Sequence, residues 1–150
     1  MELRSDWSDW FACLNANEVE YIVVGAFAVA HYGLPRLTGD IDVLLLPEVQ
    51  NVQRLLAALD QFGFSSLNLM AEDFMKQDNV IQLGRVPGRI DIMTSISGVS
   101  NDEAFSSSVI GMLGEQRVRF ISLENLLRNK SATGRTKDLQ DVEQLKDLAP

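Results

Sequence analysis

The sequence predicts an α/β (α+β) fold in which a small mixed β-sheet is flanked by helices. Short apolar runs rich in β-branched residues alternate along the chain with segments whose apolar residues recur at helical spacing. Two of the apolar runs, 80–83 and 89–93, are joined by a short Val-Pro-Gly turn and must therefore pair antiparallel. The 150 residues fit one hydrophobic core, so we expect a single domain over 1–150.

The first half of the chain alternates helices and strands. The expected elements are a helix near 6–16, a strand over 21–24, a helix over 26–32, a strand over 41–46 and a helix over 49–62. Trp7 and Trp10 lie on one face of the first helix, and this face is either core or a protein interface. Gly25, Gly33 and Pro47 interrupt the pattern where one element gives way to the next.

The second half adds strands and two final helices. The expected elements are strands over 80–83 and 89–93, a helical turn over 101–106, a hairpin of 109–113 and 116–121, and two helices. Ser122 can cap the first of these helices and Gly134 ends it. Thr136 can cap the last helix, with an apolar face of Leu139, Val142 and Leu145.

The composition and charge of the chain exclude some classes of function. A formal net charge of −8 argues against unspecific nucleic-acid binding. No apolar run is long enough to cross a membrane, and the N-terminus lacks the pattern of a signal peptide, so we expect a cytoplasmic protein without a membrane partner. The segment 117–137 holds six basic residues against one acid, Glu124. It is either a solvated basic face or a patch for a phosphate-bearing ligand.

Three aspartates are the candidate metal ligands. Asp40 and Asp42 alternate with apolar residues in Gly39-Asp40-Ile41-Asp42-Val43, so on a strand their side chains share a face. Asp91 lies in a second strand between two isoleucines, where an acid is rare without a partner. Hard divalent ions such as Mg²⁺ prefer carboxylate oxygen. An ion pair of Asp91 with Arg89 or Arg85 is the alternative explanation.

Upstream of these aspartates, a strand ends at Gly25-Ala26 and a helix opens. Such a turn lets the backbone approach an anionic group, with free helix N–H groups pointing at it. His31, the only histidine, is expected to be a partly buried structural residue, and Cys13 to be a core residue. Asp138 and Asp141 are expected to be charges near a helix N-terminus.

Together these motifs resemble the polymerase-β-like nucleotidyltransferase superfamily. In that superfamily Gly-Gly or Gly-Ser opens a helix, Asp-x-Asp follows on the next strand, and a third Asp lies on a later strand. The nearest likeness is to the bacterial branch that includes abortive-infection toxins, whose tail has a Lys and then Arg-x-Lys-Asp. Lys130 and Arg135-Thr136-Lys137-Asp138 match this tail, and Ala26 departs from the usual Ser or Gly.

The resemblance implies a nucleotidyltransferase-like fold and a concrete site. Asp40, Asp42 and Asp91 would be catalytic and would hold two Mg²⁺ ions, and a nucleoside triphosphate such as ATP would be the substrate. The implied nucleotide-binding residues are Gly25, Ala26, Arg36, Thr38, Lys130 and Lys137. The implied reaction moves a nucleoside monophosphate onto a hydroxyl of RNA, protein or a small molecule.

Two kinds of alternative stay open from the sequence. The chain could be a non-catalytic binding protein of the same fold, such as one component of a toxin–antitoxin pair with a cognate partner. Asp-x-Asp also occurs in glycosyltransferases, which need a larger fold. It occurs again in aspartyl-phosphate phosphatases, which want Thr or Val four residues after the first Asp, where this chain has Leu44.

Overall fold

The computed structural model describes residues 3–148. Its strands are β1 Tyr21–Val24, β2 Asp40–Leu45, β3 Val80–Leu83, β4 Arg89–Met93, β5 Val109–Leu113 and β6 Gln116–Phe120. Its α-helices are α1 Ser5–Ala16, α2 Gly25–His31, α3 Val49–Phe62, α4 Asn101–Ser106, α5 Leu123–Thr133 and α6 Thr136–Leu148. Two short 3₁₀ helices, η1 Ser65–Leu67 and η2 Ala71–Phe74, follow α3. The elements lie within a residue or two of the expected ranges, and the mixed α/β class is confirmed.

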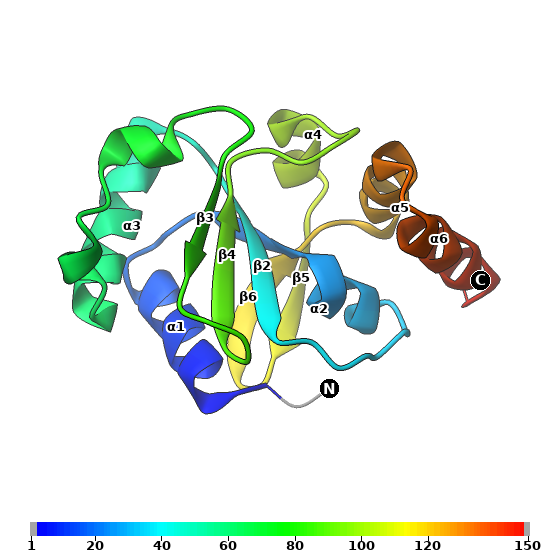
Figure 1. Ribbon diagram of the computed structural model, residues 1–150, viewed down its shortest axis with the longest axis horizontal. Coiled ribbons are helices and arrows are strands. Elements are labelled where there is room, and N and C mark those ends of the chain that lie inside the picture. Colours follow the sequence, from blue (N-terminus) through cyan, green and yellow to red (C-terminus); the bar gives the residue numbers. More distant parts are fainter. Residues whose placement is uncertain (1–2, 149–150) are drawn as a thin grey trace.

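The strands form one mixed sheet in the order β3-β4-β2-β1-β6-β5 (Figure 1). The two hairpins, β3–β4 and β5–β6, are antiparallel, as predicted. They occupy the two ends of the sheet. Strand β2 lies between them, antiparallel to β1 and parallel to β4. Its register with β4 sets Asp42 directly beside Asp91, which positions the site described below.

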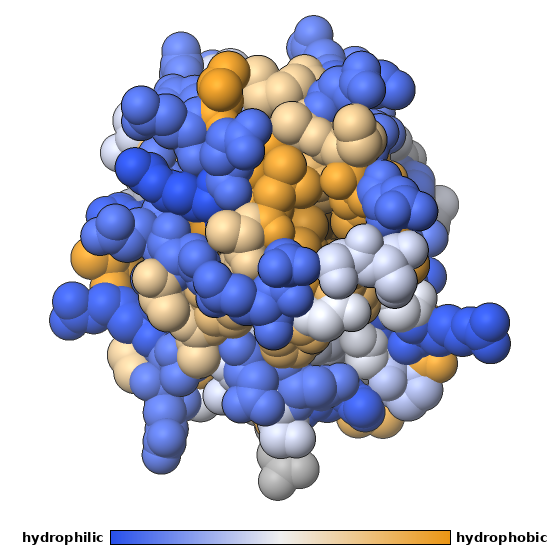
Figure 2. All heavy atoms as spheres, turned by 90° about the vertical axis from the view of Figure 1, so that its left-hand side faces the viewer, coloured by the Kyte–Doolittle hydropathy of each residue, from blue (hydrophilic) through white to orange (hydrophobic). Residues whose placement is uncertain are grey.

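Helices α1 and α3 lie beside one another on one side of the sheet, whereas α5 and α6 form a pair on the opposite side of the molecule (Figure 1). Trp7 and Trp10 of α1 are buried, and the ring of Trp10 meets that of Phe62 edge to face at 5.5 Å. The aromatic face of α1 is therefore core rather than an interface. Figure 2, which views the α1 and α3 side, shows apolar side chains between polar ones.

The buried face of α6 differs from the prediction. It consists of Asp138, Asp141, Val142 and Leu145, whereas Leu139 is 45% exposed. The two aspartates point inward because both pair with the buried Lys130, and at helical spacing this turns Leu139 outward. Thr136 is the first residue of the helix rather than the residue before it.

His31 is more exposed than expected, whereas Cys13 packs against the core as expected. His31 is exposed, and its ring stacks on Phe120 with centroids 4.0 Å apart. It is the last residue of α2, and the ring of Tyr32 meets it edge to face at 4.9 Å. Cys13 is half-buried at the edge of the core. None of the described helices is both long and apolar enough to span a bilayer.

Candidate active site

The three aspartates meet at neighbouring positions on the two central strands. Asp40 and Asp42 share a face of β2 because side chains alternate along a strand. The parallel register pairs Asp42 with Asp91 of β4. One carboxylate oxygen from each residue lies within 4.8 Å of the others. The structure thus brings together the three residues that the sequence selects.

Arg89 lies among these carboxylates. Its Nη2 donates to Asp40 Oδ2 at 2.7 Å and to Asp91 Oδ2 at 3.2 Å, and its Nε donates to Asp91 Oδ1 at 2.9 Å. The ion pair that the sequence offered as an explanation for Asp91 is therefore present, and it includes Asp40 as well. The hydroxyl of Thr38 lies 2.9 Å from Asp40 Oδ1, so Thr38 orients this carboxylate.

The electrostatics of the cluster favour an additional cation. Burial, and then the charges of Asp40 and Asp91, raise the pKa of Asp42 to about 7. Burial also raises the pKa of Asp91, although hydrogen bonds from Arg89 oppose the rise. The cluster holds three carboxylates and one guanidinium, which contacts two of them, so negative charge remains in excess. Carboxylate oxygens this close together are a donor set that suits Mg²⁺.

Gly25 is required where α2 begins beside this cluster. Its φ is +67°, in the left-handed region that favours glycine. A Cβ atom at this position would lie 2.1 Å from Asp42 Oδ2, far inside any real contact. The absence of a side chain therefore lets the start of α2 approach the Asp42 carboxylate.

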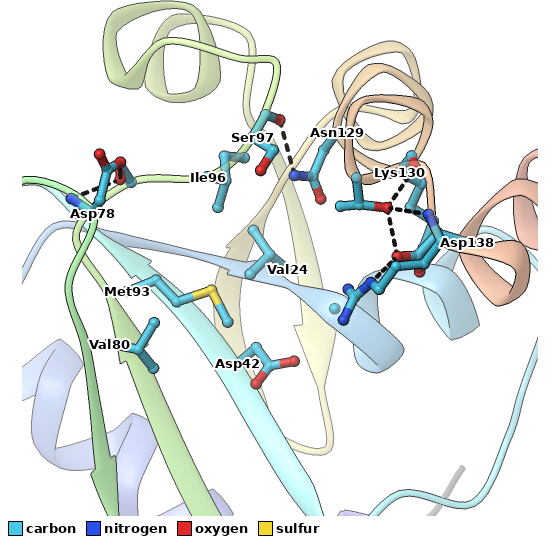
Figure 3. A pocket seen from close by; sticks show the side chains of 14 residues that line it. Val24, Asp42, Asp78, Val80, Met93, Ile96, Ser97, Asn129, Lys130 and Asp138 are labelled. Atoms are coloured by element: carbon cyan, nitrogen blue, oxygen red, sulfur yellow. Dashed lines mark hydrogen bonds and ion pairs between the residues drawn. The ribbon is translucent and has the colours of Figure 1, made fainter.

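An open cavity of about 450 Å³ extends from Gly25 and Asp42 (Figure 3). Apolar side chains of the sheet and of the segment after β4 contribute Val24, Val80, Met93 and Ile96 to its wall. Lys130 and Asp138 lie across the cavity from Asp78 in Figure 3, and Arg135 also lines the cavity. Five polar lining residues were not selected from the sequence: Asp78, Ser95, Ser97, Asn129 and Thr133.

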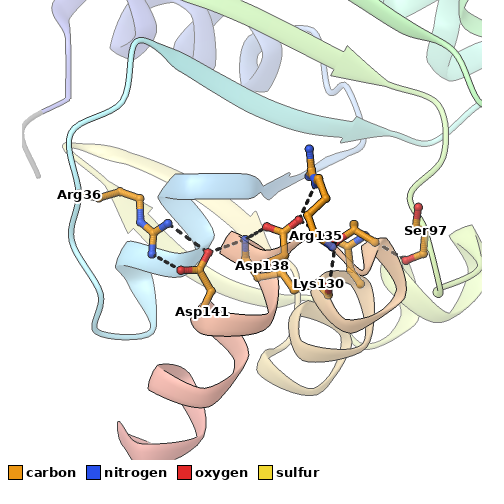
Figure 4. A network of polar contacts seen from close by, with 8 residues as sticks. Arg36, Ser97, Lys130, Arg135, Asp138 and Asp141 are labelled. Carbon is orange, nitrogen blue, oxygen red and sulfur yellow. Dashed lines mark hydrogen bonds and ion pairs between the residues drawn. The ribbon is translucent and has the colours of Figure 1, made fainter.

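A buried network of ion pairs links α5 to α6 (Figure 4). Lys130 Nζ lies 3.0 Å from Asp138 Oδ1 and 3.0 Å from Asp141 Oδ2. Arg135 Nε and the Thr133 hydroxyl both donate to Asp138 Oδ2, at 2.8 Å and 2.7 Å. Burial raises the pKa of Asp138, but hydrogen bonds from Thr133 and Lys130 outweigh this effect and lower the pKa to about 2. Asp138 lies in the first turn of α6, but it mainly neutralises cations.

The remaining sequence-selected residues lie outside the cavity wall. Arg36 donates to both oxygens of Asp141, at 2.8 Å and 3.1 Å, and so ties the segment before β2 to α6. Thr38 contacts Asp40 and is not part of the wall. Ala26 is half-buried in the first turn of α2, and Lys137 is exposed on α6. Of the six nucleotide-binding candidates, Gly25 and Lys130 line the cavity.

Sequence comparison gives no matching family model and no matching curated protein. Solved structures do match. TM1012 of Thermotoga maritima, a proposed nucleotidyltransferase, aligns at a TM-score of 0.60 with 13% identity over 95% of this chain and 91% of that one. The lincomycin-bound lincosamide antibiotic adenylyltransferase LnuA aligns at a TM-score of 0.57 with 14% identity over 99% of both chains. The chain therefore has the fold of these nucleotidyltransferase structures.

Proposed function

We propose that the protein is a Mg²⁺-dependent nucleotidyltransferase that moves a nucleoside monophosphate from a triphosphate, such as ATP, to a hydroxyl acceptor. One observation carries the proposal: Asp40, Asp42 and Asp91 form one cluster, and its member Asp42 lies beside Gly25 and lines the cavity. The fold shared with LnuA, an adenylyltransferase, supports the same reaction class. Membership of the abortive-infection branch stays a prediction.

The three aspartates would hold the metal ions. Two Mg²⁺ ions, when bound, would stabilise negative charge on the attacking and leaving oxygens. Within residues 3–148, Arg89 donates to Asp40 and Asp91 and not to Asp42, so the Asp42 carboxyl, which interacts with Asp91, is available as a ligand. Thr38 would keep Asp40 oriented, because its hydroxyl already contacts Oδ1.

The start of α2 and the cations of α5 and α6 would bind the triphosphate. Gly25 and Ala26 open α2 with backbone N–H groups free of helical partners, and such groups bind phosphate well. Lys130 and Arg135 line the same cavity, although both are paired with Asp138. Arg135 is the more mobile donor because its side chain is 75% exposed. Lys137, next to Asp138 in the sequence, is exposed on α6 and does not line the cavity.

The reaction is a substitution at phosphorus. The acceptor hydroxyl loses its proton to solvent, its oxygen forms a bond to the α-phosphorus, the bond from that phosphorus to the bridging oxygen breaks, and pyrophosphate leaves. Catalysis of this kind depends on positioning and charge, which the carboxylates and the cavity supply. The acceptor is a hydroxyl of RNA, protein or a small molecule. LnuA, by its name, modifies a small antibiotic.

Calorimetric titration of each nucleoside triphosphate, with and without Mg²⁺, tests the proposal. We expect the wild type to bind a triphosphate only with Mg²⁺ present. In Asp42→Asn the affinity should fall at least about tenfold, because a metal ligand is lost. Asp60→Asn is the matched control, since Asp60 is exposed on α3. Transfer of labelled nucleotide to candidate acceptors then tests catalysis.

The opposite outcome is equally informative. If no triphosphate binds the wild type at any Mg²⁺ concentration, the proposed activity is wrong. The chain would then be a binding protein of this fold, such as one member of a toxin–antitoxin pair, and a pull-down with a tagged chain would search for its partner.

A further inference from the structure

Arg89 is the only cation in direct contact with the carboxylate cluster among residues 3–148. It contacts both oxygens of Asp91 and one oxygen of Asp40. Asp42 and the Oδ1 atom of Asp40 receive no hydrogen bond from Arg89. The cluster is therefore divided into a half that Arg89 neutralises and a half that it does not.

This division makes the two halves unequal as metal sites. An ion bound by Asp42 and Asp40 Oδ1 would leave every contact of Arg89 intact. An ion bound between Asp40 and Asp91 would compete with the guanidinium for the same oxygens. It would also repel Arg89, because two cations within a few ångströms of each other are strongly unfavourable away from bulk water.

Arg89 is able to leave its place. It is the first residue of β4, and its side chain is 28% exposed, so the guanidinium can turn toward solvent without disturbing the core. Its hydrogen bonds to charged oxygens are strong, however, so departure has a free-energy cost that a second metal ion must offset.

We propose that Arg89 is an internal counter-ion that competes with one of the two metal ions and so sets the order in which they bind. The first ion binds at Asp42. The second binds only when Arg89 releases Asp40 and Asp91. This inference rests on the proposed function, because it concerns the metal ions of that same site, and it adds a positioning residue that gates one of them.

Counting bound Mn²⁺ by electron paramagnetic resonance tests the order of binding. We would titrate the wild type, Arg89→Met and Arg85→Met at about pH 8, where protons compete little for carboxylates. Arg85 is exposed on the same β3–β4 turn and forms no ion pair within the described residues, so Arg85→Met removes an equal charge nearby. We expect the second Mn²⁺ to bind at least about tenfold more tightly to Arg89→Met. In Arg85→Met, the affinity for the second Mn²⁺ should change by about twofold or less.

Thermal unfolding without divalent ions gives a second readout. Arg89→Met leaves three close carboxylates without their cation, so its unfolding temperature should fall below that of the wild type and of Arg85→Met. Added Mn²⁺ should raise it by more than it raises the wild-type value. Arg89→Lys keeps the charge but loses the planar guanidinium that holds two carboxylates. Its affinity for the second Mn²⁺ and its unfolding temperature should therefore lie between those of the wild type and Arg89→Met.

The outcomes separate this inference from the proposed function. If the wild type binds Mn²⁺ and Arg89→Met gives the same affinities and stoichiometry as Arg85→Met, the gating role of Arg89 is wrong and the metal site stands. If neither the wild type nor Arg89→Met binds Mn²⁺ more tightly than Asp42→Asn does, the metal site itself is absent. Both ideas are then overturned.

Discussion

At the scale of single residues, the contact between Gly25 and Asp42 is the tightest constraint on the site. Gly25→Ala combines a left-handed backbone with a Cβ atom 2.1 Å from the Asp42 carboxylate. Gly134→Ala has the same backbone constraint, φ +68°, but open space around its Cβ. We expect Gly134→Ala to lower the free energy of unfolding by about 1 kcal/mol. Gly25→Ala should cost about 2 kcal/mol more.

The two glycine variants should also differ in metal binding. Gly25→Ala must displace Asp42, so its affinity for Mn²⁺ should fall, whereas Gly134→Ala should bind like the wild type. Urea unfolding and Mn²⁺ titration measure the two effects. Equal behaviour of the two variants would mean that the close approach of Gly25 to Asp42 does not matter.

The raised pKa of Asp42 predicts how stability depends on pH. The unfolded carboxyl loses its proton near its ordinary pKa of 3.8, whereas the folded one retains it up to about pH 7. Between these values the native state binds more protons, so the free energy of unfolding falls as pH rises, by up to about 1.4 kcal/mol per pH unit. Asp42→Asn should flatten this slope in urea unfolding with a chelator present. An unchanged slope would exclude Asp42 as its source.

The sequence identifies a site residue only where the neighbouring residues form a recognisable pattern. Asp40 and Asp42 stand out because alternation places two acids on one face of an apolar strand. The double contact of Arg89 requires the parallel pairing of β2 and β4, which no local pattern specifies. Asp78 and Asn129 reach the cavity from segments far apart in the sequence, and neither has a distinctive neighbourhood.

At the scale of elements, the α5–α6 pair depends on buried charge. Asp141 accepts from Arg36 and pairs with Lys130, so Asp141→Asn leaves two cations without a full partner. Breaking such a group is costly, and partial exposure of Arg36 reduces the loss, so we expect about 2 kcal/mol from urea unfolding. Asp147→Asn, at an exposed position of the same helix, should change stability by less than about 0.5 kcal/mol. Similar losses in both variants would show that the network adds little.

The order of helices and strands along the chain can be predicted from the sequence, whereas the pairing of the strands in the sheet is harder to predict. Periodicity and turn residues located the hairpins and helices because these signals are local. The parallel contact of β1 with β6 joins residues about a hundred positions apart, for example Val23 with Phe120, and has no local signal. The prediction that Leu139 faces the core is wrong for the same reason. The buried aspartates of α6 pair with Lys130, which lies on another helix.

At the scale of the whole molecule, the charge balance opposes an anionic substrate. The net charge is −8, and the cavity wall itself holds Asp42, Asp78 and Asp138 against Lys130 and Arg135. A triphosphate therefore meets a repulsive field unless metal ions change the sign of the site. This is the reverse of a nucleic-acid-binding surface, on which added salt weakens attraction.

The field predicts how salt affects the encounter with nucleotide. At saturating Mg²⁺, raising the salt from about 0.01 M to about 0.15 M shortens the screening length from about 30 Å to about 8 Å. The repulsion between the acidic chain and the anionic Mg²⁺–nucleotide complex then weakens, so the association rate should rise. Stopped-flow fluorescence with a labelled nucleotide measures this rate, and labelled nucleoside without phosphates provides the uncharged control. A rate that falls with salt would mean that Lys130 and Arg135 dominate the local field despite their pairing with Asp138.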